Sequence, residues 1–188
     1  MRVAYAGAPG AFAHQACLQF APHHEPVAVE GFSAVAEALE RGEVDIGMLP
    51  VRNSCAGPVA EVADLLSAQR LEVVSEHDLA VRMHLLGLPG AEFASIQTVV
   101  SHPVALTQCA EHLRQLKVVT RAAANTAIAA RDLADSAEAV LASEAAAVVY
   151  GLIILRPNMH DDPDNITVFA RVALRSAPSA LPHSATLL

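Results

Sequence analysis

The strongest constraint on the fold is a repeated alternation of short apolar segments with segments of helical periodicity. The chain opens with a predicted strand at Val3–Ala6, a turn at Gly7–Gly10 and a helix at Ala11–Phe20. The same order continues with predicted strands at Val27–Glu30 and Val44–Leu49 and predicted helices at Ser33–Arg41 and Val59–Ala68. This alternation predicts an α/β fold with a largely parallel sheet covered by helices.

A second set of alternating elements predicts a second lobe. The segment Leu71–Leu86 has an extended pattern, and we interpret it as a crossing between lobes. Beyond it lie predicted strands at Thr98–Val100, Lys117–Thr120 and Ala139–Ala142, and predicted helices that start at Pro103, cover Thr126–Asp135 and end at Tyr150. Ile166–Leu174 is then expected to return to the first lobe as a strand. The predicted division is 1–78 with 161–175 for the first lobe, 79–160 for the second and 176–188 for a C-terminal tail that is either poorly ordered or a peripheral arm.

Composition excludes several classes of function. The 20 acidic residues outnumber 12 basic ones, and the net charge of −8 disfavours binding to nucleic acid or to anionic membranes. With no signal core and no apolar membrane span, we expect a cytoplasmic protein. Cys17, Cys55 and Cys109 are odd in number and widely spaced, which predicts free thiols. The segment 161–165 lacks the glycine and later glutamate of a calcium loop, so no metal site is expected.

Six short motifs, distributed along most of the chain, carry a family resemblance. They are Gly7-Ala8-Pro9-Gly10-Ala11-Phe12, Pro50-Val51-Arg52-Asn53-Ser54, Ser101-His102-Pro103, Asn125-Thr126-Ala127, Tyr150-Gly151-Leu152 and Asn165-Ile166-Thr167-Val168-Phe169. In order and spacing they resemble the prephenate dehydratase family. The resemblance implies a two-lobed, periplasmic-binding-protein-like α/β fold with a ligand cleft between the lobes.

The same resemblance implies a carbon–oxygen lyase of phenylalanine biosynthesis. The family converts prephenate, a small anion, to phenylpyruvate, water and carbon dioxide, and it uses no metal, nucleotide or redox cofactor. A homo-oligomer is expected, with a homodimer as the predicted state. Only 19 residues follow Phe169, which is too few for the regulatory ACT domain common in the family. Allosteric control by phenylalanine through such a domain is therefore not expected.

Thr167 is the expected catalytic residue, because it occupies the hydroxyl position of the family's Thr-Arg-Phe signature. It would donate a hydrogen bond to the leaving hydroxyl of the substrate. An alcohol is a weak acid at neutral pH, so we expect polarisation within a wider network instead of unaided proton donation. The β propensity of threonine also explains Thr167 without a catalytic role. Phe169, which ends the signature, is predicted to contribute to substrate binding.

The other expected substrate-binding residues follow predicted strands or begin predicted helices. Asn53 and Ser54 retain the last two residues of the family's Glu-Asn-Ser motif and offer amide and hydroxyl groups to a carboxylate or a ring hydroxyl. Ser101 and His102 precede a helix that starts with proline, and Thr126 begins the next helix, where backbone N–H groups favour an anion. Turn formation and N-capping explain the same residues without a ligand.

Several positions depart from the family pattern. Arg52 stands where the family has Glu, and Val168 stands where the signature has Arg, so the charge of this pair changes from zero to plus one. One hypothesis is that Arg52 replaces the missing cation as a substrate-binding residue, and the alternative is a solvated loop arginine. Ala11 and Ala13 replace family hydroxyl residues, although backbone N–H groups at this helix start are still able to bind an anion.

Two further functions remain open on sequence grounds. A prephenate decarboxylase would remove the carboxylate without forming an aromatic ring. A non-catalytic small-anion binding module would use the same two-lobed fold, because fold alone does not specify chemistry. The product formed from prephenate distinguishes these alternatives from a dehydratase.

Overall fold

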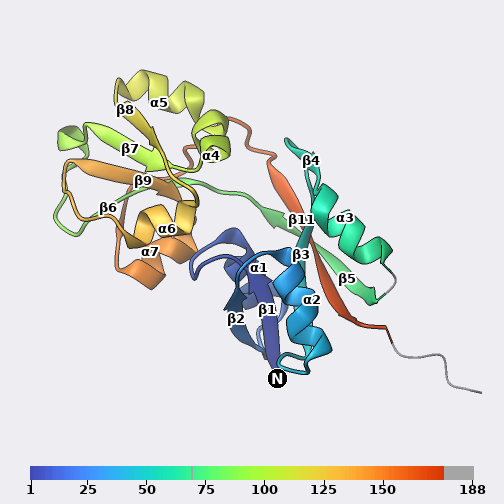
Figure 1. Cartoon of the computed structure of the whole chain (residues 1–188). Helices are drawn as coiled ribbons and strands as arrows, with labels where there is room; N and C mark the ends of the chain where they lie inside the picture. Colours follow the sequence, from blue (N-terminus) through green and yellow to red (C-terminus); the bar gives the residue numbers. More distant parts are fainter. Residues whose placement is uncertain (69, 176–188) are drawn as a thin grey trace, which may run out of the picture.

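The computed structural model describes residues 1–68 and 70–175, and these form two α/β lobes, each built on one sheet (Figure 1). The first sheet has the order β2-β1-β3-β11-β5, with β4 paired to β3, and the second has the order β10-β6-β9-β7-β8. The predicted two-lobed α/β architecture is confirmed. The predicted tail, 176–188, lies outside the described residues.

The bounds of the elements follow the chain from one lobe to the other and back. The first lobe contains β1 (Arg2–Ala6), α1 (Phe12–Phe20), β2 (Glu25–Val29), α2 (Phe32–Glu40), β3 (Ile46–Asn53), β4 (Gly57–Pro58), α3 (Ala60–Ser67), β5 (Leu71–Ala80) and β11 (Ile166–Leu174). The second contains β6 (His84–Gly87), the short 3₁₀ helix η1 (Phe93–Ser95), β7 (Thr98–Ser101), α4 (Pro103–Gln108), α5 (Ala110–Leu116), β8 (Val119–Ala122), α6 (Thr126–Arg131), β9 (Glu138–Ala142), α7 (Glu144–Tyr150) and β10 (Ile153–Arg156). None of the described helices is long and apolar enough to cross a membrane.

Both sheets are mixed, so the prediction of a largely parallel sheet is wrong. In the first lobe β1 is parallel to β2 and β3, but β11 is antiparallel to β3 and β5. In the second lobe β7 is parallel to β8 and β9, whereas β6 is antiparallel to β9 and β10. The βα units supply the parallel strands. The antiparallel pairings are the short β3–β4 hairpin and those that involve β5, β6, β10 or β11, the strands next to the crossings between lobes.

Several predicted boundaries also shift. The helix predicted from Pro103 is broken at Cys109, whose φ of −120° interrupts the helical backbone between α4 and α5. Helix α6 ends at Arg131, before the predicted end at Asp135. Strand β3 continues to Asn53, so the motif expected after the strand forms its last residues. Strand β5 enters the region assigned to the second lobe, and the division at 78/79 and 160/161 stays a prediction.

The first-lobe core lies on both faces of its sheet. Tyr5 and Phe169 pack on the face covered by α1, while Leu49 and Val172 pack on the face covered by α2. Phe169 and Val172 lie on the same strand, β11, but belong to different clusters, because successive side chains of a strand point to opposite faces of the sheet. This alternation decides which residues near the ends of β3 and β11 face the cleft.

The loop before α1 is fixed against the second lobe. Gly10 has a φ of +84°, and a Cβ atom there would lie 2.8 Å from the Cα of Ala146. The Ser143 hydroxyl donates to the carbonyl oxygen of Gly10 at 2.6 Å, and the Tyr150 hydroxyl donates to that of Pro9 at 2.6 Å. The start of α1 is thereby held at the boundary between the lobes.

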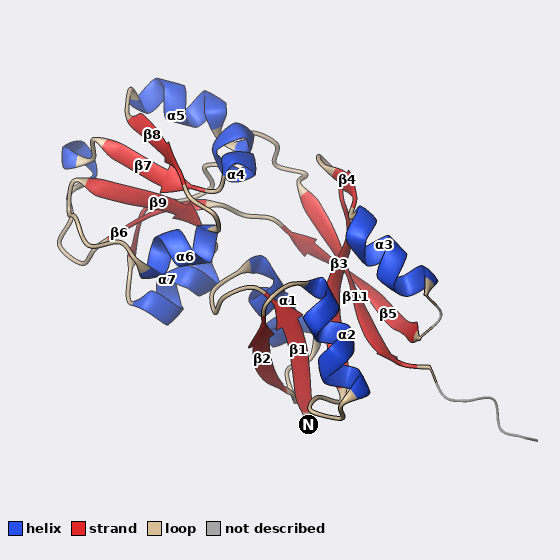
Figure 2. Cartoon of the chain, in the orientation of Figure 1, coloured by secondary structure: helices blue, strands red, loops and turns tan. Residues whose placement is uncertain are grey.

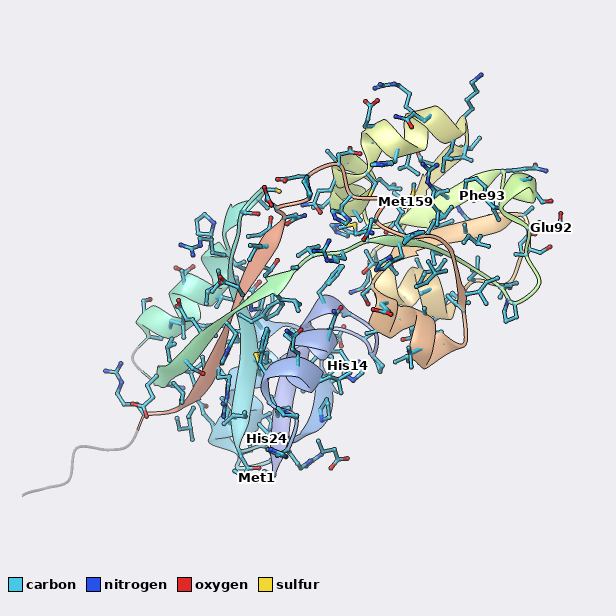
Figure 3. All side chains as sticks on the ribbon, turned by 180° about the vertical axis from the view of Figure 1, so that it is seen from behind. Met1, His14, His24, Glu92, Phe93 and Met159 are labelled. Carbon is cyan, nitrogen blue, oxygen red and sulfur yellow. The ribbon has the colours of Figure 1, made fainter. Side chains whose placement is uncertain are left out.

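Two chain crossings join the lobes, and both are drawn as loops between strands in Figure 2. They run side by side, because the Met159 N–H donates to the Met83 carbonyl at 2.7 Å and the Val81 N–H donates to the Asn165 carbonyl at 2.8 Å. Met159 is fully buried where the crossings meet the second lobe (Figure 3). The two paired crossings therefore lie together at the boundary between the lobes.

Candidate functional site

A cavity of about 370 Å³ lies between the lobes. Its described lining comes from the start of α1, the end of β3 and the turn after it, β11, the first crossing, α4 and the start of α6. The lining residues are Phe12, Asn53, Ala56, Val81, Met83, His102, Val104, Ala105, Gln108, Ala124, Asn125, Thr126 and Thr167. None of these is Asp, Glu, Lys or Arg, so an anion in this cavity would be bound by neutral donors.

Asn53 and Thr167 face each other across paired strands, β3 and β11. The Asn53 Nδ2 atom donates to Thr167 Oγ1 at 2.9 Å and to Asn165 Oδ1 at 2.8 Å. Its Oδ1 accepts from the backbone N–H groups of Cys55 at 3.0 Å and Ala56 at 2.9 Å. Backbone N–H groups only donate, so they fix which end of the Asn53 amide is oxygen.

This fixed amide also determines the role of the Thr167 hydroxyl. Because Thr167 Oγ1 accepts a hydrogen bond from Asn53, the hydroxyl proton is left to donate elsewhere. Thr167 lines the cavity, so that proton is available to a ligand there. Asn53 is a positioning residue in this arrangement, since its donors and acceptors are already used within the protein.

Two helix starts present further donors to the cavity. His102 caps α4, with Nδ1 accepting from the Val104 N–H at 3.2 Å, so the ring proton resides on Nε2 and is free to donate. Thr126 is the first residue of α6, and the preceding Asn125 caps this helix by accepting from the Ala127 N–H at 2.8 Å. Both His102 and Thr126 line the cavity.

The start of α1 adds backbone donors. Its N-cap residue, Ala11, makes no side-chain cap, and the next residue, Phe12, lines the cavity. First-turn N–H groups have no partner within a helix and favour negative charge. His14, on the same helix, accepts from the Gly10 N–H at 3.0 Å and stacks on Tyr5, so it supports the loop (Figure 3). Burial lowers the pKa of His14, which keeps the ring an acceptor.

Three of the expected substrate-binding residues lie outside this cavity. Ser101 is fully buried and donates to the Leu141 carbonyl at 2.7 Å. Phe169 is only 2% exposed and belongs to the first-lobe core. The Ser54 hydroxyl accepts from the Ile166 N–H at 2.9 Å and thereby fixes the start of β11. These three side chains do not line the cavity. They make contacts within the protein that stabilise the neighbouring backbone.

Arg52, the fourth such residue, lies opposite Val168 in the β3–β11 pairing. Side chains alternate along a strand, so this pair faces away from the cavity that Asn53 and Thr167 line. Arg52 is exposed, does not line this cavity and makes no ion pair within 1–68 and 70–175. The two departures from the family charge pattern, Arg52 and Val168, are thus partners in the β3–β11 pairing. This geometry does not support the hypothesis that Arg52 binds the substrate as a replacement cation.

Sequence reasoning missed several lining residues. Gln108 lies one helical turn after Val104 on α4, and this spacing would have indicated a shared face. Phe12 ends the first of the six motifs, but only its alanine neighbours, Ala11 and Ala13, had been related to anion binding. Val81 and Met83 belong to the crossing, where no helical or strand periodicity predicts which side chains face a ligand.

Comparison with known families decides the relationship of this chain. The model of the family described as "Prephenate dehydratase" matches residues 3–177. The chain belongs to the prephenate dehydratase family. This confirms the resemblance inferred from the motifs.

Curated plant proteins of this family are among the relatives. The chain is 39% identical over 176 residues to "Arogenate dehydratase/prephenate dehydratase 1, chloroplastic" of Arabidopsis thaliana, and 41% identical over 177 residues to "Arogenate dehydratase 2" of Petunia hybrida. Each match covers 92% of this chain and 45% of the relative. The chain therefore spans a little under half the length of these curated relatives.

Solved structures show the same fold. A prephenate dehydratase from Arthrobacter aurescens in complex with L-Phe superposes with a TM-score of 0.86 and 26% identity, over 94% of this chain and 61% of that chain. A structure described as "GqqA- a novel type of quorum quenching acylases" superposes with a TM-score of 0.87 and 32% identity, over 97% of this chain and 67% of that chain. The prephenate dehydratase fold thus extends over nearly all of the described residues.

Proposed function

We propose that this chain catalyses the dehydration and decarboxylation of a prephenate-type cyclohexadiene acid to an aromatic product. The observation that carries the proposal is the Thr167 hydroxyl, which lines the cavity and accepts from Asn53 at 2.9 Å. Because the Thr167 oxygen accepts from Asn53, the hydroxyl proton is left to donate to a ligand in the cavity. The proposed reaction is that of the family to which the chain belongs.

The chemistry requires two bonds of the substrate ring to break. The C–O bond to the ring hydroxyl and the C–C bond to the ring carboxylate break, and the electron pair of the latter completes the aromatic ring. Thr167 donates a hydrogen bond to the departing oxygen as negative charge develops on it. With prephenate, one proton from solvent converts the departing hydroxide to water, and phenylpyruvate and carbon dioxide are released.

Neutral groups bind the substrate in this proposal. The N–H groups at the start of α1, the His102 Nε2–H, the Gln108 amide and the Thr126 hydroxyl are the donors for a carboxylate. Phe12 and Met83 supply apolar surface for the ring. Because apolar side chains exclude water, each hydrogen bond in the cavity is stronger than it would be in solvent.

Product identification tests the proposal. Purified protein is incubated with prephenate and with its amino-acid counterpart, arogenate, and the products are separated by chromatography. An aromatic product supports a dehydratase, a non-aromatic keto acid supports the decarboxylase, and saturable binding without turnover supports the binding module. Thr167→Val should lower kcat by about 100-fold or more with a smaller change in KM, while Thr167→Ser keeps the donor. Unchanged kcat in a folded Thr167→Val protein would remove Thr167 from the mechanism.

The structural likeness to a quorum-quenching acylase gives a second reaction to test. Acyl transfer uses a nucleophile whose proton is taken by a neighbouring base. Among the described residues, Thr167 accepts a hydrogen bond from an amide nitrogen and contacts no base, so the geometry favours a donor over a nucleophile.

A cytoplasmic location and a homodimer remain predictions. Free Cys17, Cys55 and Cys109 support a reducing compartment.

A further inference from the structure

The proposed reaction consumes one proton, and the first cavity has no acid placed to supply it. Its described lining contains no Asp, Glu or Lys, and its one histidine, His102, donates to a carboxylate in the proposed function. Thr167 polarises the departing oxygen through a hydrogen bond, but an alcohol is a weak acid at neutral pH. The proton must therefore come from outside this cavity.

A second cavity of about 450 Å³ adjoins the first. The two share Ala56, Val104 and Gln108 in their linings. The remaining lining residues of the second cavity are Cys55, Pro103, Thr107, Asp161, Asp162 and Asn165. Its described lining contains two carboxylates and no basic side chain, so it disfavours the carboxylates of an anionic substrate. The second cavity is thus a space beside the substrate that the substrate itself does not fill.

The two cavities meet beside the residues that orient the proposed catalytic hydroxyl. The shared lining residue Ala56 donates its N–H to Asn53 Oδ1 at 2.9 Å, and Asn53 Nδ2 donates to Thr167 Oγ1 at 2.9 Å. The same Nδ2 atom donates to Asn165 Oδ1 at 2.8 Å. A substrate oxygen that departs beside Thr167 therefore leaves next to the second cavity.

Asn165 provides an independent sign of a bound molecule in the second cavity. Its side chain lines this cavity, is 2% exposed, and has an Nδ2 atom without a partner among the described residues. The orientation is fixed, because Asn165 Oδ1 accepts from Asn53, whose own amide is oriented by backbone N–H groups. A buried donor without an acceptor costs free energy that the oxygen of a bound water recovers.

Asp162 connects this buried donor with solvent. It is an exposed residue that lines the same cavity. Its carboxylate accepts from the Asp164 N–H at 2.9 Å and from the Cys55 thiol at 3.3 Å, and no described basic group forms an ion pair with it. Asp161, in contrast, accepts from the His112 ring at 2.9 Å and from two backbone N–H groups of α5. Asp162 is therefore the carboxylate with capacity to accept from water and to exchange a proton with solvent.

The second cavity has room for several water molecules between these two residues. A water takes up about 30 Å³ in the liquid and needs two to four polar partners when it is buried. The Gln108 amide and the Thr107 hydroxyl add partners to Asn165 and Asp162. The Thr107 hydroxyl donates to the Pro103 carbonyl at 3.0 Å, so its oxygen is left to accept.

We infer that the second cavity delivers the proton to the departing oxygen, through water molecules held by Asn165 Nδ2 and Asp162. As the C–O bond breaks, the oxygen takes the bonding pair and accepts a proton from the nearest water. Each water regains a proton from the next, and Asp162 takes the last one up from solvent. The two negative side chains favour the arrival of a proton and disfavour hydroxide, so the oxygen leaves as neutral water. This inference rests on the proposed function and adds a proton-relay residue to the same site.

The test measures the single-turnover rate of aromatic product formation from prephenate and from arogenate. It compares the wild-type chain with Asp162→Asn and with the matched control Asp164→Asn, an exposed residue of the same loop that lines neither cavity. The wild-type rate should be lower in heavy water, because a proton moves in this step. Asp162→Asn should reduce the rate by about tenfold or more without weakening substrate binding, because the group that exchanges the proton is lost. Asp164→Asn should leave both unchanged.

Chemical rescue separates proton delivery from a structural role. Added formic acid should restore the rate of Asp162→Asn in proportion to its concentration, and it should not accelerate the wild type or Asp164→Asn. Urea unfolding checks that the variant is folded. Asp162→Ser, which retains an acceptor for the Asp164 N–H, replaces it if necessary.

Three results would overturn the inference: a wild-type rate that is equal in heavy water, a folded Asp162→Asn protein within about threefold of the wild-type rate, or a loss of rate that formic acid does not restore. If the wild type converts neither acid to an aromatic product, the proposed function fails on its own. A crystal structure of the wild-type chain then tests the second cavity directly. A water within about 3.2 Å of Asn165 Nδ2 supports a water-filled cavity, and an empty position there overturns it.

Discussion

Asn53→Asp is the sharpest test of the network around Thr167. The substitution keeps the shape of the side chain and the oxygen that accepts from Cys55 and Ala56. It replaces the Nδ2 donor by an oxygen that meets three acceptors: Thr167 Oγ1, Asn165 Oδ1 and the Ile166 carbonyl. Thr167 must then donate to the new carboxylate, and its proton is no longer available to the substrate.

The magnitude follows from these contacts. The Asn53 NH2 group has two protons for its three acceptors, so about two neutral hydrogen bonds are lost, worth about 2 kcal/mol together, and the new bond from Thr167 to a carboxylate returns about 1.5–3 kcal/mol. Repulsion between the carboxylate and the two remaining oxygens adds to the loss. We expect a net destabilisation of about 1–2 kcal/mol. The kcat value should fall by about 100-fold or more, because the donor to the leaving oxygen is occupied.

Steady-state product formation and urea unfolding measure the two effects separately. Protonation of the new carboxyl restores a donor, so kcat of Asn53→Asp relative to wild type should recover as the pH is lowered. Asp164→Asn is the matched control, since Asp164 is an exposed residue of the loop that leads into β11 and lies outside the cavity. A folded Asn53→Asp protein with kcat within about threefold of wild type would refute the assignment of Asn53 as the residue that orients Thr167.

Three further outcomes are expected. Arg52→Ala should change KM by less than about twofold, because an exposed side chain outside the cavity contributes little to binding; a large KM increase that salt diminishes would restore the relocated-cation hypothesis. Burial lowers the pKa of His84 and, together with Arg82, that of His160, so the folded state binds fewer protons than the unfolded state. The urea midpoint should therefore fall as the pH drops below about 6.5, and His160→Asn, which keeps an acceptor for the Met83 N–H, should reduce that slope. Gly10→Ala should destabilise the fold by about 1–3 kcal/mol and raise KM, because φ is +84° and the new Cβ would meet Ala146; an unchanged unfolding midpoint would contradict the described contact between the lobes.

The sequence predicted the two-lobed α/β fold and most of its helices and strands, because the signals for these elements are local. Hydrophobic alternation marks each strand and helix within a few residues, and turn residues mark most of the boundaries. The order of strands in the sheets is not local, since β11 pairs with β3 and β5 through register that no short segment encodes. The mixed direction of the strands was missed for the same reason.

Of the motif residues that the sequence predicted for the site, only some line the cavity. Thr167 and His102 line the cavity, whereas their motif neighbours Phe169 and Ser101 are buried in the lobes. Thr167 and Phe169 are two residues apart and share a face of β11, but Phe169 packs in the first-lobe core on that face and does not reach the cavity. A motif therefore identifies a group of adjacent residues without showing which of their side chains contact a ligand. Met83 illustrates the remaining gap, because a crossing has no periodicity and its exposure depends on how two lobes meet.

The placement of β11 has a consequence for how the protein is made. Asn53 and Thr167 are 114 positions apart, and β11 is an interior strand of the first sheet although it is translated after the whole second lobe. During synthesis, β3 and β5 leave the ribosome with the gap between them unfilled, and the second lobe is free to fold first. The strand that closes this gap also carries the proposed catalytic hydroxyl. A partly synthesised chain therefore has neither a closed first sheet nor a complete site, and both arise in one late step.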